Sequence, residues 1–198
     1  MIKTIGSIFL AAVLAASFTG CNKKATPEEL AEQEQADFRC RIDSQLAPEW
    51  ACGNANLDGS ITAVGSSPLS KLGQNFSRRE AMANARSNLA QQIETLIKDK
   101  VELFARATGV GGAEVADKVS TQVSKQVAKV TLNGSKQLKF WQNPSTQSIY
   151  VLVGVDESAM NQEAQNSVKS SYKNDNALWQ QFQAKQALES LEKEFPTD

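Results

Sequence analysis

Few residues in this 198-residue sequence can carry out chemistry, and histidine is absent from all of it. Without histidine there is no Ser-His or Cys-His nucleophile pair, no imidazole acid or base and no histidine metal site. The cysteines are Cys21, Cys40 and Cys52. Carboxylate pairs exist, but none stands in the apolar setting that raises a carboxyl pKa for acid catalysis. The sequence therefore predicts a protein that is not an enzyme and uses no cofactor or metal.

The first 20 residues have the pattern of a secretion signal. Lys3 gives a basic start, and the apolar run from Ile5 to Phe18 is too short for a membrane-spanning helix, which needs roughly 20 residues. The run ends in Ser17-Phe18-Thr19-Gly20-Cys21, which resembles the lipobox of bacterial lipoproteins, with Phe18 where an aliphatic residue is usual. The resemblance implies cleavage after residue 20 and acylation of Cys21. The alternative is an ordinary signal peptide followed by an incidental cysteine.

A lipidated chain would be held at a membrane through this anchor, because each buried methylene contributes about 0.8 kcal/mol. Asn22 stands where some lipoproteins carry the aspartate that retains them at the inner membrane. We therefore expect the protein to be anchored in the outer membrane, on its periplasmic face or at the cell surface.

Loss of Lys3 with the signal leaves 20 basic and 22 acidic residues, a formal charge of −2. Such a balance provides no basic surface for nucleic acid.

Cys40 and Cys52 form an even pair in an oxidising compartment, which predicts a disulfide. Closing this short loop would stabilise the fold by about 3 kcal/mol on the chain-entropy model. The alternative is two free thiols. Two cysteines without histidine cannot supply the usual four ligands of zinc.

Two segments resemble ligand-binding loops but are better explained as connections. Residues 54–59 read Asn-x-Asn-x-Asp-Gly, like the opening of a calcium loop, yet the first position is not Asp and the twelfth, Gly65, is not Glu. A turn that enters a strand is the simpler interpretation. Residues 109–112 read Gly-Val-Gly-Gly, but they follow a predicted helix and lack the Lys-Ser/Thr ending of a phosphate loop. They predict a connector between two helices.

Four further side chains are candidates for an interaction site. Arg86 lies on a predicted helix and can bind an acidic group of a partner, or pair with a carboxylate or helix-end carbonyl of its own domain. Trp50, Trp141 and Tyr150 can form an aromatic ligand patch, or pack in the core at the ends of a sheet. Both interpretations stay open for each of them.

These residues must be positioned by a small number of elements. Residues 21–45 are expected to be a lipidated tether with a polar spacer helix, which begins near Thr26-Pro27. Ser60 to Ser66 alternates as a strand. Ser77 and Glu80 form a capping box for a long helix that ends at Thr108, before Gly109.

A second helix is predicted from Gly111-Gly112 to Asn133-Gly134, because valines recur there every four residues. Residues 136–142 alternate, with Leu138 and Phe140 on one side and Trp141 on the other. Residues 149–155 are apolar on both faces, which is typical of a covered central strand. Residues 159–198 form a helical extension whose thin apolar stripe should dock on the domain or on a partner; the stripe consists of Leu178, Phe182, Leu188, Leu191 and Phe195.

The predicted class is α+β, in the order β-α-α-β-β, with a small three-stranded antiparallel sheet packed on two long helices. Residues 46–158 in this arrangement resemble the LPP-twenty lipoprotein family. The resemblance rests on the lipobox cysteine and on short motifs in a fixed order: Pro48-Glu49-Trp50, Val64-Gly65, Ala81, Ala85-Arg86, Leu89-Ala90, Asn133-Gly134, Trp141 and Tyr150-Val151-Leu152-Val153.

The resemblance implies a small domain on the outer membrane, in a family that includes flagellar lipoproteins forming a disk or ring as well as surface antigens. The chain departs from the family pattern by the Cys40–Cys52 insertion and about forty extra C-terminal residues. We expect a structural or interaction protein that forms a homo-oligomer or docks on an envelope or flagellar assembly. The open alternatives are a module that binds a small glycan or lipid, and a flagellar lipoprotein needed for motility.

Overall fold

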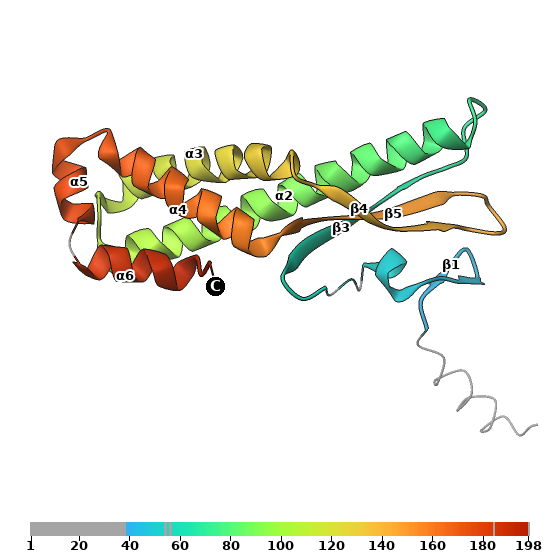
Figure 1. Cartoon of the computed structure of the whole chain (residues 1–198), viewed down its shortest axis with the longest axis horizontal. Helices are drawn as coiled ribbons and strands as arrows, with labels where there is room; N and C mark the ends of the chain where they lie inside the picture. Colours follow the sequence, from blue (N-terminus) through green and yellow to red (C-terminus); the bar gives the residue numbers. More distant parts are fainter. Residues whose placement is uncertain (1–38, 54, 56, 184, 198) are drawn as a thin grey trace, which may run out of the picture. The chain divides into compact units, whose positions relative to one another are not determined.

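The structure, a computed structural model, describes residues 39–53, 55, 57–183 and 185–197. They belong to one compact unit that starts at Arg39. The predicted signal, Cys21 and the spacer as far as residue 38 lie outside the described residues, and the end of the expected spacer, from Arg41 on, forms strands instead of a helix. The elements follow in the order β1 (Arg41–Ile42), β2 (Gln45–Leu46), the 3-10 helix η1 (Glu49–Cys52), β3 (Ser60–Ser67), α2 (Gln74–Thr108), α3 (Gly112–Leu132), β4 (Lys136–Gln142), β5 (Ile149–Asp156), α4 (Glu157–Lys173), α5 (Asn176–Phe182) and α6 (Lys185–Glu194) (Figure 1).

The predicted α+β class is confirmed. The main sheet is antiparallel with strand order β3-β5-β4, so the apolar strand β5 is central, as its two covered faces require. Ile149, Val151, Val153 and Val155 face the helices and join the main core, whereas Leu152 points to the other face and joins a separate cluster. A β-bulge at Leu138 interrupts the register between β4 and β5.

Helix α2 covers the inner face of this sheet. Its central stripe repeats every four residues through Ala81, Ala85, Leu89, Ile93 and Ile97, all fully buried. Small residues let the helix approach β3 closely: a methyl group built on Gly65 would lie 2.1 Å from the backbone nitrogen of Ala85. The Val64-Gly65 and Ala81/Ala85 motifs therefore meet as one contact between strand and helix.

The predicted capping box of α2 is wrong. The helix begins one turn earlier, after Gly73, and no side chain caps it. Ser77 is buried inside the first turns, and its Oγ accepts a hydrogen bond from the backbone N–H of Ser70. Glu80 accepts one from the hydroxyl of Ser67. Both side chains therefore hold the loop between β3 and α2, a role that the local pattern does not distinguish from capping.

The other predicted boundaries of the helix pair are confirmed. Gly109 has the left-handed conformation expected of a helix stop, and its N–H bonds the carbonyl of Ala105. In α3 the four-residue period buries Val119, Val123 and Val127 against α2.

The C-terminal helices complete the main core. Helix α4 starts directly after β5, where the carboxylate of Asp156 accepts a hydrogen bond from the N–H of Ala159. Of the predicted apolar stripe, Phe182, Leu191 and Phe195 are fully buried, and α6 packs on α2 (Figure 1). Leu178 also packs against the core, whereas Leu188 is exposed, so most of the stripe covers the domain itself.

Candidate functional site

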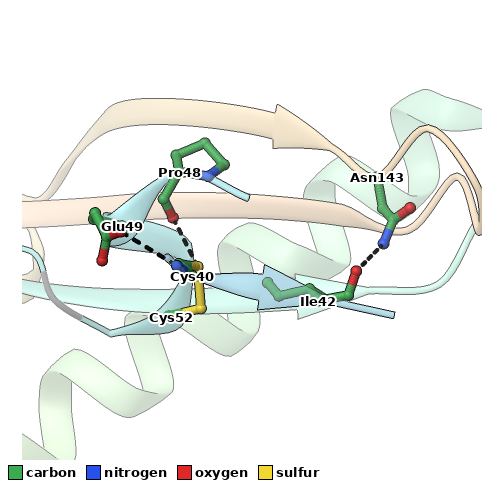
Figure 2. The surroundings of a disulfide bond; sticks show 6 residues. All are labelled: Cys40, Ile42, Pro48, Glu49, Cys52 and Asn143. Atoms are coloured by element: carbon green, nitrogen blue, oxygen red, sulfur yellow. Dashed lines mark hydrogen bonds between the residues drawn. A yellow bond between two sulfur atoms is a disulfide. The ribbon is translucent and has the colours of Figure 1, made fainter. Parts of the chain in front are cut away.

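The outer face of the sheet, opposite α2, is covered by a cap made of β1, β2 and η1. The Cys40–Cys52 disulfide predicted from the sequence is present and ties the start of this cap to its end, with the two Cα atoms 6.0 Å apart. Figure 2 shows how the cap is fastened: the Cys40 N–H donates to a carboxylate oxygen of Glu49 at 3.2 Å, and Asn143 donates to the carbonyl of Ile42 at 3.2 Å. The hairpin of β1 and β2 was missed, because two-residue strands show no period.

Trp50 of the cap and Trp141 and Tyr150 of the sheet come together where the cap meets the sheet. Trp50 is buried with Leu152, and the rings of Trp141 and Tyr150 are 5.2 Å apart. Burial, followed by the charge of Asp43, raises the pKa of the Tyr150 hydroxyl above its ordinary value. The three aromatic side chains pack the cap onto the sheet.

Arg86 does not join these aromatic side chains. It lies on α2, is exposed, and donates from Nε to the hydroxyl of Ser135 at 3.1 Å. Ser135 immediately precedes β4, so this bond joins the middle of α2 to the start of that strand. A second arginine of α2 makes a similar contact with β4: the guanidinium of Arg78 donates to the side-chain oxygen of Gln137 at 2.9 Å.

Strand β4 carries an exposed surface that the sequence analysis did not identify. Leu138 and Phe140 remain 42% and 41% exposed. The expectation that they share one side is wrong: Phe140 pairs with Val151, which faces the helices, whereas the bulge turns Leu138 onto Gly154 on the outer face. We call the exposed side chains around this edge strand, on both faces of the sheet, the edge patch; it consists of Lys136, Leu138, Lys139 and Phe140 of β4 with Arg78 of α2. The guanidinium of Arg78 lies 5.5 Å from the centre of the Phe140 ring.

The two edges of the sheet differ in their protection. On the free side of β3, Asn84 donates to the carbonyl of Ser66 and Asn88 to the carbonyl of Val64, both at 2.8 Å. These α2 side chains occupy acceptors that a foreign strand would need. Among the described residues, β4 pairs on one side only, with β5, and the strand itself contains the bulge and two lysines.

A cleft of about 730 Å³ lies between the free edge of β3 and α2. Its apolar part comes from Val64, Leu96 and Leu152. The polar part is uncharged except for one carboxylate, and it is formed by Thr62, Asn88, Gln91, Gln92, Thr95 and Asp99.

The described part of the chain contains no group of three or more His, Cys, Asp or Glu side chains placed to hold a metal ion. Asp58 and Gly59, from the segment that resembles a calcium loop, form a turn: the Ser60 N–H bonds the carbonyl of Leu57 as the chain enters β3. Within the same described residues, no helix is long and apolar enough to cross a membrane.

A family model for the LPP20 lipoprotein matches residues 48–156, more than half of the chain. The chain belongs to the LPP20 lipoprotein family. No match to it is found among curated proteins. The matched region starts at Pro48, just before η1, and ends at the last residue of β5, so it contains the complete β-α-α-β-β unit of this LPP20 lipoprotein.

The match also defines what surrounds the family unit in this LPP20 protein. Cys52 lies inside it and Cys40 outside, so the disulfide attaches the preceding β1–β2 hairpin to the unit. The segment from α4 to Phe195, just after α6, lies beyond the matched residues, yet it supplies Tyr172, Phe182 and Phe195 to the same core as α2.

Proposed function

We propose that this LPP20 lipoprotein is a non-catalytic protein of the outer membrane, acylated on Cys21 after removal of residues 1–20, and that it acts as a structural or interaction module. It self-associates or docks on an envelope assembly. The observation that carries this proposal is the edge patch, where two large apolar side chains and two lysines stand exposed on the edge strand β4 and Arg78 of α2 lies beside them.

The edge patch has the chemistry of a protein contact. Arginine and aromatic side chains are enriched in protein interfaces, and here the Arg78 guanidinium lies over the ring of Phe140. The bulge and the two lysines oppose pairing with a random strand, so recognition would go through side chains more than through backbone ladders. Arg78, Lys136 and Lys139 favour a partner surface that combines carboxylates with apolar groups.

A second candidate function is supported by the cleft beside β3. Its amide and hydroxyl side chains can exchange hydrogen bonds with an uncharged polyhydroxyl ligand, and its apolar floor can contact the carbon faces of a sugar ring. A small envelope glycan fits this description. Binding of soluble glycan fragments, followed by chemical-shift changes of Gln91, Gln92 and Thr95, would favour this function over assembly.

The assembly proposal is tested with the acylated full-length protein in detergent, by light scattering after size exclusion and by chemical cross-linking. We expect oligomers for the wild type and loss of most of them in Leu138→Ser/Phe140→Ser. The matched control is Val130→Ser/Leu188→Ser, which removes side chains of similar exposure, 44% and 40%, from helices. Monomers at high concentration without cross-linked species, in purified protein and in membranes, would contradict the proposal. Cys21→Ser should move the protein out of the membrane fraction.

A further inference from the structure

The loop between β3 and α2, residues 68–73, displays the most exposed large apolar side chain among the described residues. Leu72 is 73% exposed, Leu69 is 46% exposed, and Lys71 stands exposed between them. Burying apolar side chains is the main source of folding stability, so a domain gains nothing in isolation by holding two leucines in water.

This loop is held in place by hydrogen bonds of its own. The Ser70 N–H donates to the Ser77 hydroxyl at 2.7 Å, and the Leu72 N–H donates to the Ser70 hydroxyl at 3.1 Å. At its start, the Ser67 hydroxyl donates to Glu80 at 3.0 Å. The loop is therefore fastened to α2 by the Ser70 backbone and by the Ser67 side chain just before it, whereas Leu69 and Leu72 stay exposed.

Other turns of the sheet lie at the same end of the unit. Gln74, which starts α2, donates to Gln142 at 2.9 Å just before the β4–β5 turn. The β4–β5 turn also holds the β1–β2 hairpin, because Asn143 donates to the carbonyl of Ile42 and to the carboxylate of Asp43. Figure 1 shows the three connections at one end, away from α5 and α6. The hairpin carries a third exposed leucine, Leu46.

We propose that this end of the sheet, which we call the leucine tip (Leu46, Leu69, Lys71 and Leu72), rests in the interface of the phospholipid bilayer that carries the anchor. Leucines flanking a lysine suit that interface, since the apolar groups enter the acyl boundary and the ammonium stays among anionic headgroups. The inference rests on anchoring at Cys21, as proposed above.

The position of the tip in the chain supports a lipid partner. The described chain starts at Arg39, immediately before the hairpin of the tip, and Cys21 lies 18 positions earlier. A segment of this length reaches at most about 60 Å, so an acylated Cys21 keeps the unit beside the bilayer. Tip and anchor then act together: the anchor supplies a high local concentration, and the tip fixes which end of the unit faces the lipid.

The test uses the acylated full-length protein in vesicles of phosphatidylethanolamine and phosphatidylglycerol, with and without brominated acyl chains. Tryptophan is introduced as Leu72→Trp, and the signal of the wild type, with Trp50, Trp141 and Trp179, is subtracted. Leu188→Trp on α6 is the matched control at the other end of α2. We expect brominated lipid to quench the tryptophan at position 72 at least about twice as strongly as the control.

A second measurement avoids the added ring. Amide hydrogen exchange of residues 69–73 should slow by about tenfold on vesicles, because burying two leucine side chains favours the inserted orientation by at least that factor. The slowing should disappear in Leu69→Ser/Leu72→Ser and persist in Leu138→Ser/Phe140→Ser. Equal quenching at positions 72 and 188 would overturn the proposal. A blue shift at position 72 without bromine quenching, growing with protein density, would place a second copy on the tip and overturn it too.

Discussion

Gly65 is the position at which one added methyl group tests the packing of this fold most directly. In Gly65→Ala the new Cβ would lie 2.1 Å from the backbone nitrogen of Ala85 and 2.4 Å from the carbonyl oxygen of Ala81. Ordinary van der Waals contacts begin near 3.4 Å. Because both atoms belong to the backbone of α2, no side-chain rotation relieves the overlap, and helix and strand must separate by roughly 1 Å.

The size of the effect follows from what that separation disrupts. Ala81, Ala85 and Val151 are fully buried at this contact. A gap of 0.5–1 Å already forfeits about a quarter to a half of the dispersion attraction of each atom pair across it. Overpacking alone costs about 1–3 kcal/mol. We therefore expect Gly65→Ala to lower the free energy of unfolding by about 3–5 kcal/mol. This is a large share of the total, which is typically about 5–15 kcal/mol for a domain.

Urea unfolding followed by circular dichroism measures this loss. Gly134→Ala is the matched control, since its new Cβ meets nothing closer than the carbonyl of Thr131 at 3.5 Å, and we expect it to change stability by less than about 1 kcal/mol. Ala85→Gly should not rescue Gly65→Ala, because the clashing atoms of residue 85 are backbone atoms. A loss below about 1 kcal/mol in Gly65→Ala, or rescue by Ala85→Gly, would refute the reasoning.

Three further predictions concern the cap, the core and the β3 edge. Cys40→Ser/Cys52→Ser should cost about 3 kcal/mol in urea unfolding, since it releases a loop with a sequence separation of 12; an unchanged midpoint would contradict this. The Tyr172 hydroxyl is buried without a hydrogen-bond partner among the described residues, so Tyr172→Phe should stabilise by about 1 kcal/mol. Burial also raises the pKa of Tyr172 above 10.0. The stability that its neutral form contributes is complete below pH 10.0 and is lost as the pH rises through the higher pKa of the folded state. The free energy of unfolding should therefore fall less steeply with alkaline pH in Tyr172→Phe than in the wild type. Asn84→Ala and Asn88→Ala should each cost about 1 kcal/mol and increase cross-linked dimers through the uncovered β3 edge, whereas unaltered stability and unaltered dimer yield would argue against guarding.

Long periodic segments were predictable because their burial repeats in the sequence. In α2 and α3, apolar residues at four-residue steps indicate the buried side of each helix. In β5, apolar residues on both faces indicate that both are covered. Gly109 was recognisable as a helix stop because a left-handed residue at that point is usually glycine. The disulfide was predictable from an even pair of cysteines in a chain expected to be secreted.

The parts of the candidate site depend on contacts that no local pattern contains. Ser77 and Glu80 form a normal capping box in the sequence, but their partners, Ser70 and Ser67, lie in the preceding loop. Asn88 meets the carbonyl of Val64 from 24 residues away. Leu138 and Phe140 were expected on one side of their strand, but a bulge that pairing with β5 creates separates them.

The sequence by itself determined the order of the elements, the family, the disulfide and the side of each long element that is buried, because these properties arise from residue type and from spacing within one helix or strand. Only the tertiary structure decided which surfaces stay uncovered. In the folded unit the C-terminal stripe closes the core, two asparagines of α2 cover one sheet edge, and the edge patch and the leucine tip remain exposed to solvent. Exposure is a property of the whole packing arrangement, since a side chain is buried or free according to what segments distant in the chain place over it.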